Sequence, residues 1–254
     1  MLNSLLKSTL QSPLQSILQS GYRLWTPDDI LSANTVFHGD ASLLTGTGNV
    51  PQLDDLSGND NHATQNTVNN QGEVGVRTLN GLNLLTARNG SKHYNIANTP
   101  TVKSIYSVVN LISTDNTTIL VLGGNSAKTA ELFIRGTATS DISFDGDGSS
   151  IGKYSLNGTD FSSNAENHST PNAPQLGGNI LSGVFNNTIS VSTFLNRSVF
   201  TSDALGHDLG EIIMTSGELS ITEQQKLVGF YAHKWGLTAK LPADHRYKHH
   251  APRV

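Results

Sequence analysis

The stretch SITEQQKLVGFYAHKWGL, residues 220–237, has clear helical periodicity, and the rest of the chain must fold around it. Ser220 followed by Glu223 is typical of a capping box, which predicts a helix over residues 220–236. Gly236 suits the left-handed position at which a helix ends. Six apolar side chains share one side of this helix, and we expect them to be buried. They are Ile221, Leu227, Val228, Tyr231, Ala232 and Trp235.

Upstream of this helix, short apolar runs alternate with polar turns, which is typical of β-strands. The strand candidates are residues 36–38, 104–111, 118–122, 131–135, 142–144, 181–185, 188–195 and 211–214. Asn80-Gly81 is a type I′ hairpin signal, and Asn186-Asn187 predicts a second hairpin turn. Roughly ten to fourteen strands at this spacing predict an antiparallel sandwich. We expect the helix to plug an end or an edge of that sandwich.

Three segments carry a resemblance to a known family. They are GFYAHKWGL at 229–237, LPADHRYK at 241–248 and LDDLSGNDNHA at 53–63. Together they resemble the signatures of concanavalin A-like, or laminin-G-like, jelly-roll domains. Leu53 stands where the family pattern has tryptophan, Asp60 replaces a glycine and Arg246 replaces a proline. The resemblance implies an all-β antiparallel jelly-roll sandwich with one C-terminal α-helix.

Composition narrows the function classes. The chain has 254 residues, 36% of them hydrophobic and 14% charged, with a formal net charge of -4 and no cysteine. A net negative chain without an evident basic face argues against nucleic-acid binding. The absence of cysteine excludes disulfides and thiolate metal sites. Because no apolar run approaches ~20 residues, we expect no membrane-spanning helix.

Residues 1–21 repeat the form Leu-polar-Ser with a period of four. The repeated leucines are Leu2, Leu6, Leu10, Leu14 and Leu18. Neither a helix nor a strand of this sequence can bury its leucines alone, and Pro13 breaks any helix. The segment is therefore either a disordered leader or an extended N-terminal arm that docks on another subunit. We expect the docking arm, followed by a sandwich domain over residues 22–254.

Catalysis needs a recognisable arrangement that this sequence lacks. A retaining glucanase places two carboxylates ~5 Å apart, commonly as Glu-x-Asp-x-x-Glu on one strand. No such run occurs, and Glu131 and Glu211 each stand alone on their strand candidates. No Gly-x-Ser-x-Gly elbow is present either. We therefore expect a protein that is not an enzyme.

Metal binding is a second candidate chemistry. Asp141, Asp145 and Asp147 provide oxygen ligands in and beside a glycine-rich loop, as a weak calcium site would. A second oxygen-rich turn contains Asp54, Asp55, Asp60 and Asn61. The family resemblance permits calcium at loop rims, so calcium is the one cofactor left open. We expect the C-terminal histidines to be structural, with Tyr247 anchoring the tail.

Glycan binding needs exposed aromatic side chains, and Tyr94 and Tyr154 are the best candidates because both have loop-like surroundings. The family resemblance points to virion proteins of bacteriophages and to bacterial surface proteins. We therefore expect a capsid-decorating or fibre-type protein, made in the bacterial cytoplasm and carried on the virion surface. It would be oligomeric in the assembly and contact other virion subunits through its arm. The alternative is a glycan-binding module of a tail fibre or bacterial surface protein.

Overall fold

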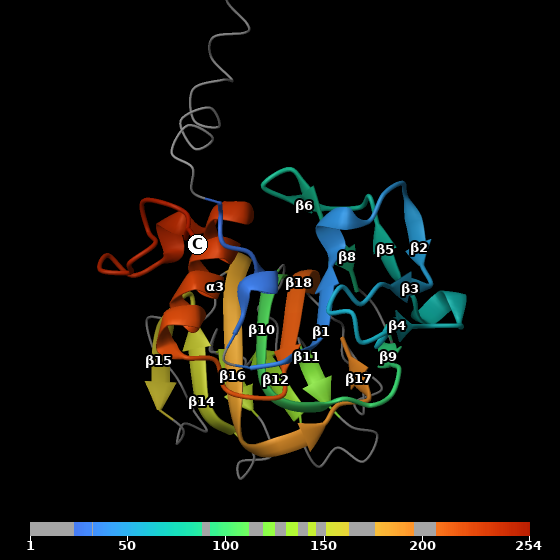
Figure 1. Cartoon of the computed structure of the whole chain (residues 1–254). Coiled ribbons are helices and arrows are strands. Elements are labelled where there is room, and N and C mark those ends of the chain that lie inside the picture. The colour runs from blue at the N-terminus through green and yellow to red at the C-terminus, as the bar shows by residue number, and fades with distance from the viewer. Residues whose placement is uncertain are drawn as a thin grey trace, which may run out of the picture.

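The computed structural model describes residues 23–31, 33–87, 92–111, 119–124, 131–136, 142–145, 151–162, 176–195 and 207–254. Within residues 119–145, and at residues 151, 161 and 162, it describes the backbone but not the side chains. These parts contain mostly β-strands and one long α-helix (Figure 1). The expected mostly β, antiparallel architecture with a C-terminal helix is therefore confirmed. The predicted arm, residues 1–21, lies outside the described residues.

The larger sheet contains nine described strands in the order β15-β14-β16-β10-β18-β8-β5-β2, and β1 also pairs with β18. All of its described pairings are antiparallel. The strands are β1 (Thr35–Asp40), β2 (Gly48–Val50), β5 (Gly72–Val74), β8 (Leu85–Thr86), β10 (Thr101–Leu111), β14 (Ile151–Leu156), β15 (Thr159–Ser162), β16 (Gly177–Ser190) and β18 (His207–Thr215). The long strands β10, β16 and β18 lie side by side at its centre.

The smaller sheet has the order β13-β12-β11-β17-β9-β4-β3. Its strands are β3 (Gln52–Leu53), β4 (Ala63–Thr64), β9 (Tyr94–Ile96), β11 (Ile119–Gly124), β12 (Glu131–Gly136), β13 (Ile142–Asp145) and β17 (Thr193–Phe194). A separate hairpin joins β6 (Thr78–Leu79) to β7 (Leu82–Asn83). Asn80 and Gly81 have φ values of 51° and 76°, so the predicted type I′ turn is confirmed.

Two hydrophobic clusters lie on opposite faces of the larger sheet. On β10, Ile105 and Val109 point into the cluster shared with the smaller sheet, whereas Tyr106 and Val108 point into the cluster under the helix. This alternation is the strand period of two. The central strand β18 is buried on both faces, since all of its residues are buried, polar ones included.

Helix α3 (Ile221–Lys234) begins with the predicted capping box, in which Ser220 and Glu223 bond each other's backbone N–H groups. Gly236 has a φ of 70°, so the predicted left-handed exit is also confirmed. Five of the six side chains expected to be buried are buried, and Trp235 is fully buried. Ile221 is 76% exposed, against expectation. Its side chain leans toward the helix N-terminus, and at the first helical position nothing lies beneath it.

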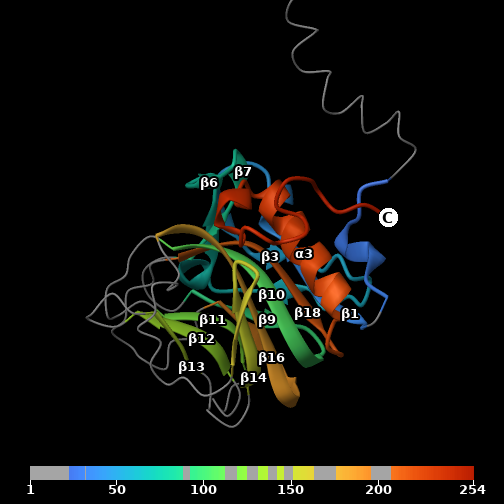
Figure 2. The ribbon, with the colours of Figure 1, turned by 90° about the vertical axis from the view of Figure 1, so that its left-hand side faces the viewer.

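The helix covers a face of the sandwich and does not plug an end or edge as we expected. Figure 2 shows α3 against β10 and β18, on the side of the larger sheet opposite β11 and β12. Its buried stripe joins Trp25, Tyr106 and Ile213 in one apolar cluster. The apolar stripe of α3 is wide enough to lie across neighbouring central strands of the larger sheet. The narrow edge of a sheet would cover only part of it.

The predicted Asn186-Asn187 hairpin turn is wrong, because β16 runs without interruption through both residues. The register with β10 shifts between Val102, which pairs with Ile189, and Ser104, which pairs with Val184. The two asparagines therefore occupy a bulge in the strand. Lys103 Nζ holds this bulge by donating to the Asn186 carbonyl oxygen at 2.8 Å.

The beginning and the end of the described fold are joined. Leu24 forms an antiparallel bridge with Arg253, and the Val254 N–H donates to the Arg23 carbonyl at 3.0 Å. Tyr247 is 5% exposed and packs on α3, so the expected anchoring of the tail is confirmed. None of the described helices is both long enough and apolar enough to cross a membrane.

Candidate functional site

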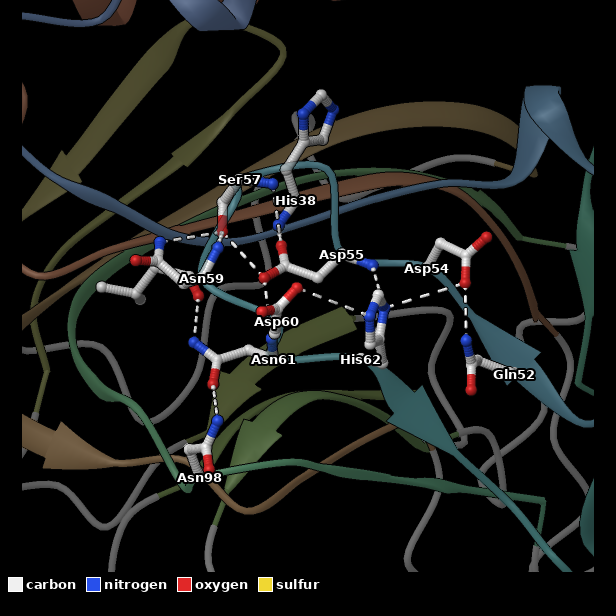
Figure 3. Close-up of polar contacts among 11 residues, drawn as sticks. His38, Gln52, Asp54, Asp55, Ser57, Asn59, Asp60, Asn61, His62 and Asn98 are labelled. Carbon is white, nitrogen blue, oxygen red and sulfur yellow. Dashed lines mark hydrogen bonds and ion pairs between the residues drawn. The ribbon is translucent and has the colours of Figure 1, made fainter.

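A polar turn between β3 and β4 is built around the carboxylate of Asp55, which is only 8% exposed. Asp55 Oδ1 accepts from the backbone N–H groups of His38 and Ser57, both at 2.9 Å. Asp55 Oδ2 accepts from Ser57 Oγ at 2.8 Å and from the Asn61 N–H at 2.9 Å. Figure 3 shows Asp55 at the centre of these contacts. Four donors on one carboxylate make this turn rigid.

The asparagines of the turn fasten it to the first strand. Asn59 Nδ2 donates to the Thr35 carbonyl at 2.8 Å, and Asn61 Nδ2 donates to the Val36 carbonyl at 2.7 Å. Gly58 and Asp60 have φ values of 82° and 55°, which explains the Gly, Asn and Asp content of this stretch. The turn and the start of β1 therefore form one body.

His62 closes the other side of the turn. Its Nδ1 accepts from the Asp55 N–H at 3.1 Å, so a neutral His62 carries its proton on Nε2. Asp54 and Asp60 lie within 4 Å of the ring, at 3.7 and 3.9 Å, and their side chains are 71% and 91% exposed. Pairs this exposed contribute little to stability.

Beside the turn lies an open groove of about 500 Å³. One wall is the segment around η1 (Pro27–Asp29) and the residues leading into β1, and the opposite wall contains Leu56, Ser57 and Asn59. His38 and Ser216 also line it. Grooves of this size hold small ligands in many proteins.

His38 connects the groove to a buried charged cluster. His38 is 7% exposed, and its Nε2 lies 2.9 Å from Glu211 Oε1. Figure 3 shows the imidazole pointing away from the polar turn. Because a carboxylate only accepts, neutral His38 must carry its proton on Nε2, which leaves the Nδ1 lone pair free to accept. Within the described residues, no hydrogen bond engages that Nδ1.

The charged cluster lies where the C-terminal end of α3 meets β1 and β18. Lys234 Nζ donates to Asp40 Oδ2 and to Glu211 Oε2, both at 2.6 Å. Trp235 Nε1 also donates to Glu211 Oε2, at 3.1 Å. Glu211 is 1% exposed, and its two oxygens accept from three side chains in all. Such pairing offsets the cost of removing these charges from water.

Tyr231 lies close to this cluster. Burial raises the pKa of Tyr231 well above its ordinary value, and the negative charges of Glu211 and Asp40 add to the shift. The phenol therefore stays protonated. Its hydroxyl has no hydrogen-bond partner among the described atoms.

Both tyrosines expected to contact glycans are buried, so that expectation is corrected. Tyr94 is 0% exposed; its hydroxyl donates to the Val50 carbonyl at 2.6 Å and accepts from the Gly72 N–H at 3.0 Å. Tyr154 is 9% exposed and belongs to the core cluster between the sheets. Each lies in a strand, β9 or β14, and its ring fills the sandwich.

The first predicted calcium loop cannot be placed. Asp141 and Asp147 lie outside the described residues, and Asp145 is described only as backbone in β13. Within the described part of the chain, no three His, Asp or Glu side chains are grouped to hold a metal ion. In the second oxygen-rich turn, the Asp55 oxygens are already occupied by N–H and O–H donors.

Sequence reasoning noted Glu211 as a lone carboxylate but missed its partners. Glu211 contacts His38 across 173 residues, and Asp40 contacts Lys234 across 194. No spacing rule reaches that far. The available signal was a glutamate inside the apolar run Gly210–Met214, because a buried charge requires a partner.

In comparisons with known proteins, no family model, curated protein or solved structure matches this chain.

Proposed function

We propose that this protein is a non-enzymatic structural component of a phage-like particle, of the capsid-decorating or fibre type, built on a jelly-roll sandwich. One observation supports the assignment most. Two of the segments that carry the family resemblance are linked by one chain of hydrogen bonds. Asp55 of the polar turn bonds the His38 backbone, His38 bonds Glu211, and Glu211 bonds Trp235 of the helix. Such a link between the polar turn and the helix is what shared signatures of one fold would provide.

Residues 1–21 attach the protein to its assembly in this proposal. The fold fixes the point from which they leave, because Arg23 bonds Val254 and Asp29, and Leu24 bridges Arg253. Trp25 is already 2% exposed in the core, two residues after this anchor. An extended arm of 21 residues reaches ~70 Å, enough to cross onto a neighbouring subunit. Each docked leucine contributes ~1.5–3 kcal/mol.

Deleting residues 1–21 tests the arm. We expect the truncated protein to be a soluble monomer with the melting temperature of the full chain, measured by calorimetry. We also expect it to be absent from purified particles, measured by quantitative gel or mass spectrometry. A matched full-length variant with the five repeated leucines changed to serine should behave in the same way. Normal occupancy of either protein would contradict the docking role.

A second candidate function is glycan recognition on a tail fibre or bacterial surface. The groove beside the polar turn favours it, because exposed Asn34, Asn59 and Asp28 line a cavity of about 500 Å³. Binding of the purified full chain to an immobilised glycan array tests this function. The particle role does not depend on the outcome.

A further inference from the structure

We infer that the groove lined by Asp28, Asn34, His38, Leu56, Ser57 and Asn59 binds a neutral pyranose sugar. The inference deepens the second candidate function and rests on it. It places recognition at a surface that the two tyrosines do not reach, since both belong to the core between the sheets.

The chemistry of the lining favours a ligand rich in hydroxyl groups. Asp28, Asn34 and Asn59 are exposed and carry planar oxygen or amide groups, which match the spacing of neighbouring sugar hydroxyls. Within the described residues, no hydrogen bond engages the side chains of Asp28 and Asn34. Ser57 adds a hydroxyl at the wall of the groove.

His38 also lines the groove, and its ring is held in a fixed orientation. Glu211 holds the Nε2 proton of His38, so Nδ1 presents a lone pair. Glu211 is in turn held by Lys234 and Trp235. This side of the groove is therefore ordered before a ligand binds, which lowers the ordering cost of binding.

The apolar part of the lining matches the carbon skeleton of a sugar ring. Ile30, Ala33 and Leu56 contribute aliphatic surface, and Leu56 is 41% exposed. Charge argues for a neutral ligand, because the exposed carboxylate of Asp28 lines the groove and no lysine or arginine is among the lining residues. An acidic sugar would be repelled by Asp28.

The walls are rigid before any ligand arrives. The Asp55 carboxylate fixes Ser57, and Asn59 Nδ2 bonds both the Thr35 carbonyl and Ser57 Oγ, at 2.8 and 2.9 Å. The Ser216 N–H donates to the Asn34 carbonyl at 2.9 Å, which joins the far wall to the end of β18. A preformed groove of this kind lowers the ordering cost that binding a monosaccharide would otherwise carry.

Nuclear magnetic resonance on the full-length protein tests the inference. The probes are glucose, galactose, mannose, N-acetylglucosamine and N-acetylgalactosamine, with sialic acid as the acidic comparison. We expect at least one neutral sugar to shift the backbone amide signals of Asn34, Ser57 and Asn59. Asn34→Ala and Asp28→Asn should weaken binding, Asn34→Ala by about tenfold. Asn49→Ala, which changes an exposed asparagine in β2 outside the groove, should leave the Kd unchanged.

The outcomes separate the site from the function. Sugar binding that shifts other residues and survives both groove substitutions would overturn this site while leaving glycan recognition in place. No binding by any of the sugars, together with an empty glycan array, would overturn both. Tighter binding of sialic acid than of every neutral sugar would overturn the assignment of ligand class. Melting temperatures of the two variants within a degree or so of the parent show that lost binding is not lost folding.

Discussion

At the scale of single residues, Glu211 is a buried carboxylate on which three side chains from distant parts of the chain converge. Its neighbours, neutral His38 Nε2–H, Lys234 Nζ and Trp235 Nε1–H, are all donors, so the site requires a side chain that only accepts. A glutamine would turn an N–H group toward another N–H group and would leave Lys234 with one carboxylate fewer.

We therefore expect Glu211→Gln to lower the free energy of unfolding by about 3–5 kcal/mol, the range for breaking a buried ion pair. Urea denaturation followed by tryptophan fluorescence measures it. The matched control is Glu218→Gln, because Glu218 pairs with Lys153 at the surface, where the side chains are 37% and 62% exposed. Its loss should stay below about 1 kcal/mol. Equal losses at both positions would contradict the central role of Glu211.

His207 makes the free energy of unfolding depend on pH in acid. It is fully buried with neither ring nitrogen hydrogen-bonded among the described atoms, and burial lowers the pKa of His207 from 6.5 to about 3. Between those two pH values the unfolded chain binds a proton that the folded chain does not. Stability from this group is complete above pH 6.5 and is lost as the pH falls toward 3. The slope is about 1.4 kcal/mol per pH unit.

Measuring urea denaturation at several pH values between 6.5 and 4 tests this effect. His207→Gln should flatten the pH dependence relative to the parent, whereas the exposed His249→Gln should keep the parent slope. Burial raises the pKa of the neighbouring Asp208, which acts in the opposite direction. Asp208 is present in all three proteins, so the difference between them isolates His207. Parallel curves for the parent and His207→Gln would refute the assignment.

At the scale of elements, Gly229 is a position where helix propensity favours a side chain but the packing of the tail leaves no room for one. It lies inside α3, where alanine is favoured over glycine by ~1 kcal/mol. A Cβ added there would lie 2.5 Å from Tyr247 Cβ, much closer than two non-bonded carbon atoms approach each other. The helix and the C-terminal tail can therefore touch only because position 229 has no side chain.

We expect Gly229→Ala to destabilise the protein by about 1–3 kcal/mol, since the tail must move to admit the methyl group. Thermal unfolding followed by circular dichroism measures it. Thr222→Ala, at an exposed position of the same helix, isolates the propensity term and should be neutral or slightly stabilising. A rise in melting temperature for Gly229→Ala would mean that the tail does not pack against α3 in solution.

Local patterns predicted the elements that local physics decides. The capping box at Ser220, the helical stripe ending at Trp235 and the Asn80-Gly81 turn depend on neighbours within a few residues, and all three are confirmed. Asn186-Asn187 has turn chemistry too, but pairing with β10 carries the strand through it as a bulge. Long-range pairing overrode local propensity there.

The candidate site was less predictable, because it depends on which distant segments meet. Tyr94 and Tyr154 have polar neighbours in sequence, yet strand alternation turns both rings into the core. His38 gave no local signal, since its partner Glu211 lies 173 residues away and its groove is formed by three separate segments. The polar turn at Asp55 was visible as a turn, but its bonds to β1 were not.

At the scale of the whole molecule, both faces of the larger sheet are covered. The segments that cover them lie far apart in the sequence. The smaller sheet covers one face, while Trp25 and the last helix cover the other. The outer layer is thus made from the first and the last described segments, joined by the bridge between Leu24 and Arg253. The groove lies where this layer meets the polar turn.

That joining of the two ends has a consequence for synthesis on the ribosome. While the chain is still being translated, Tyr106, Val108 and Ile213 have no α3 to cover them and must face water or a chaperone. That face of the larger sheet stays uncovered until α3 has left the exit tunnel. The high sequence separation of these contacts makes folding slow. Slowing growth of the producing cells by cooling should thus raise the soluble yield of this protein.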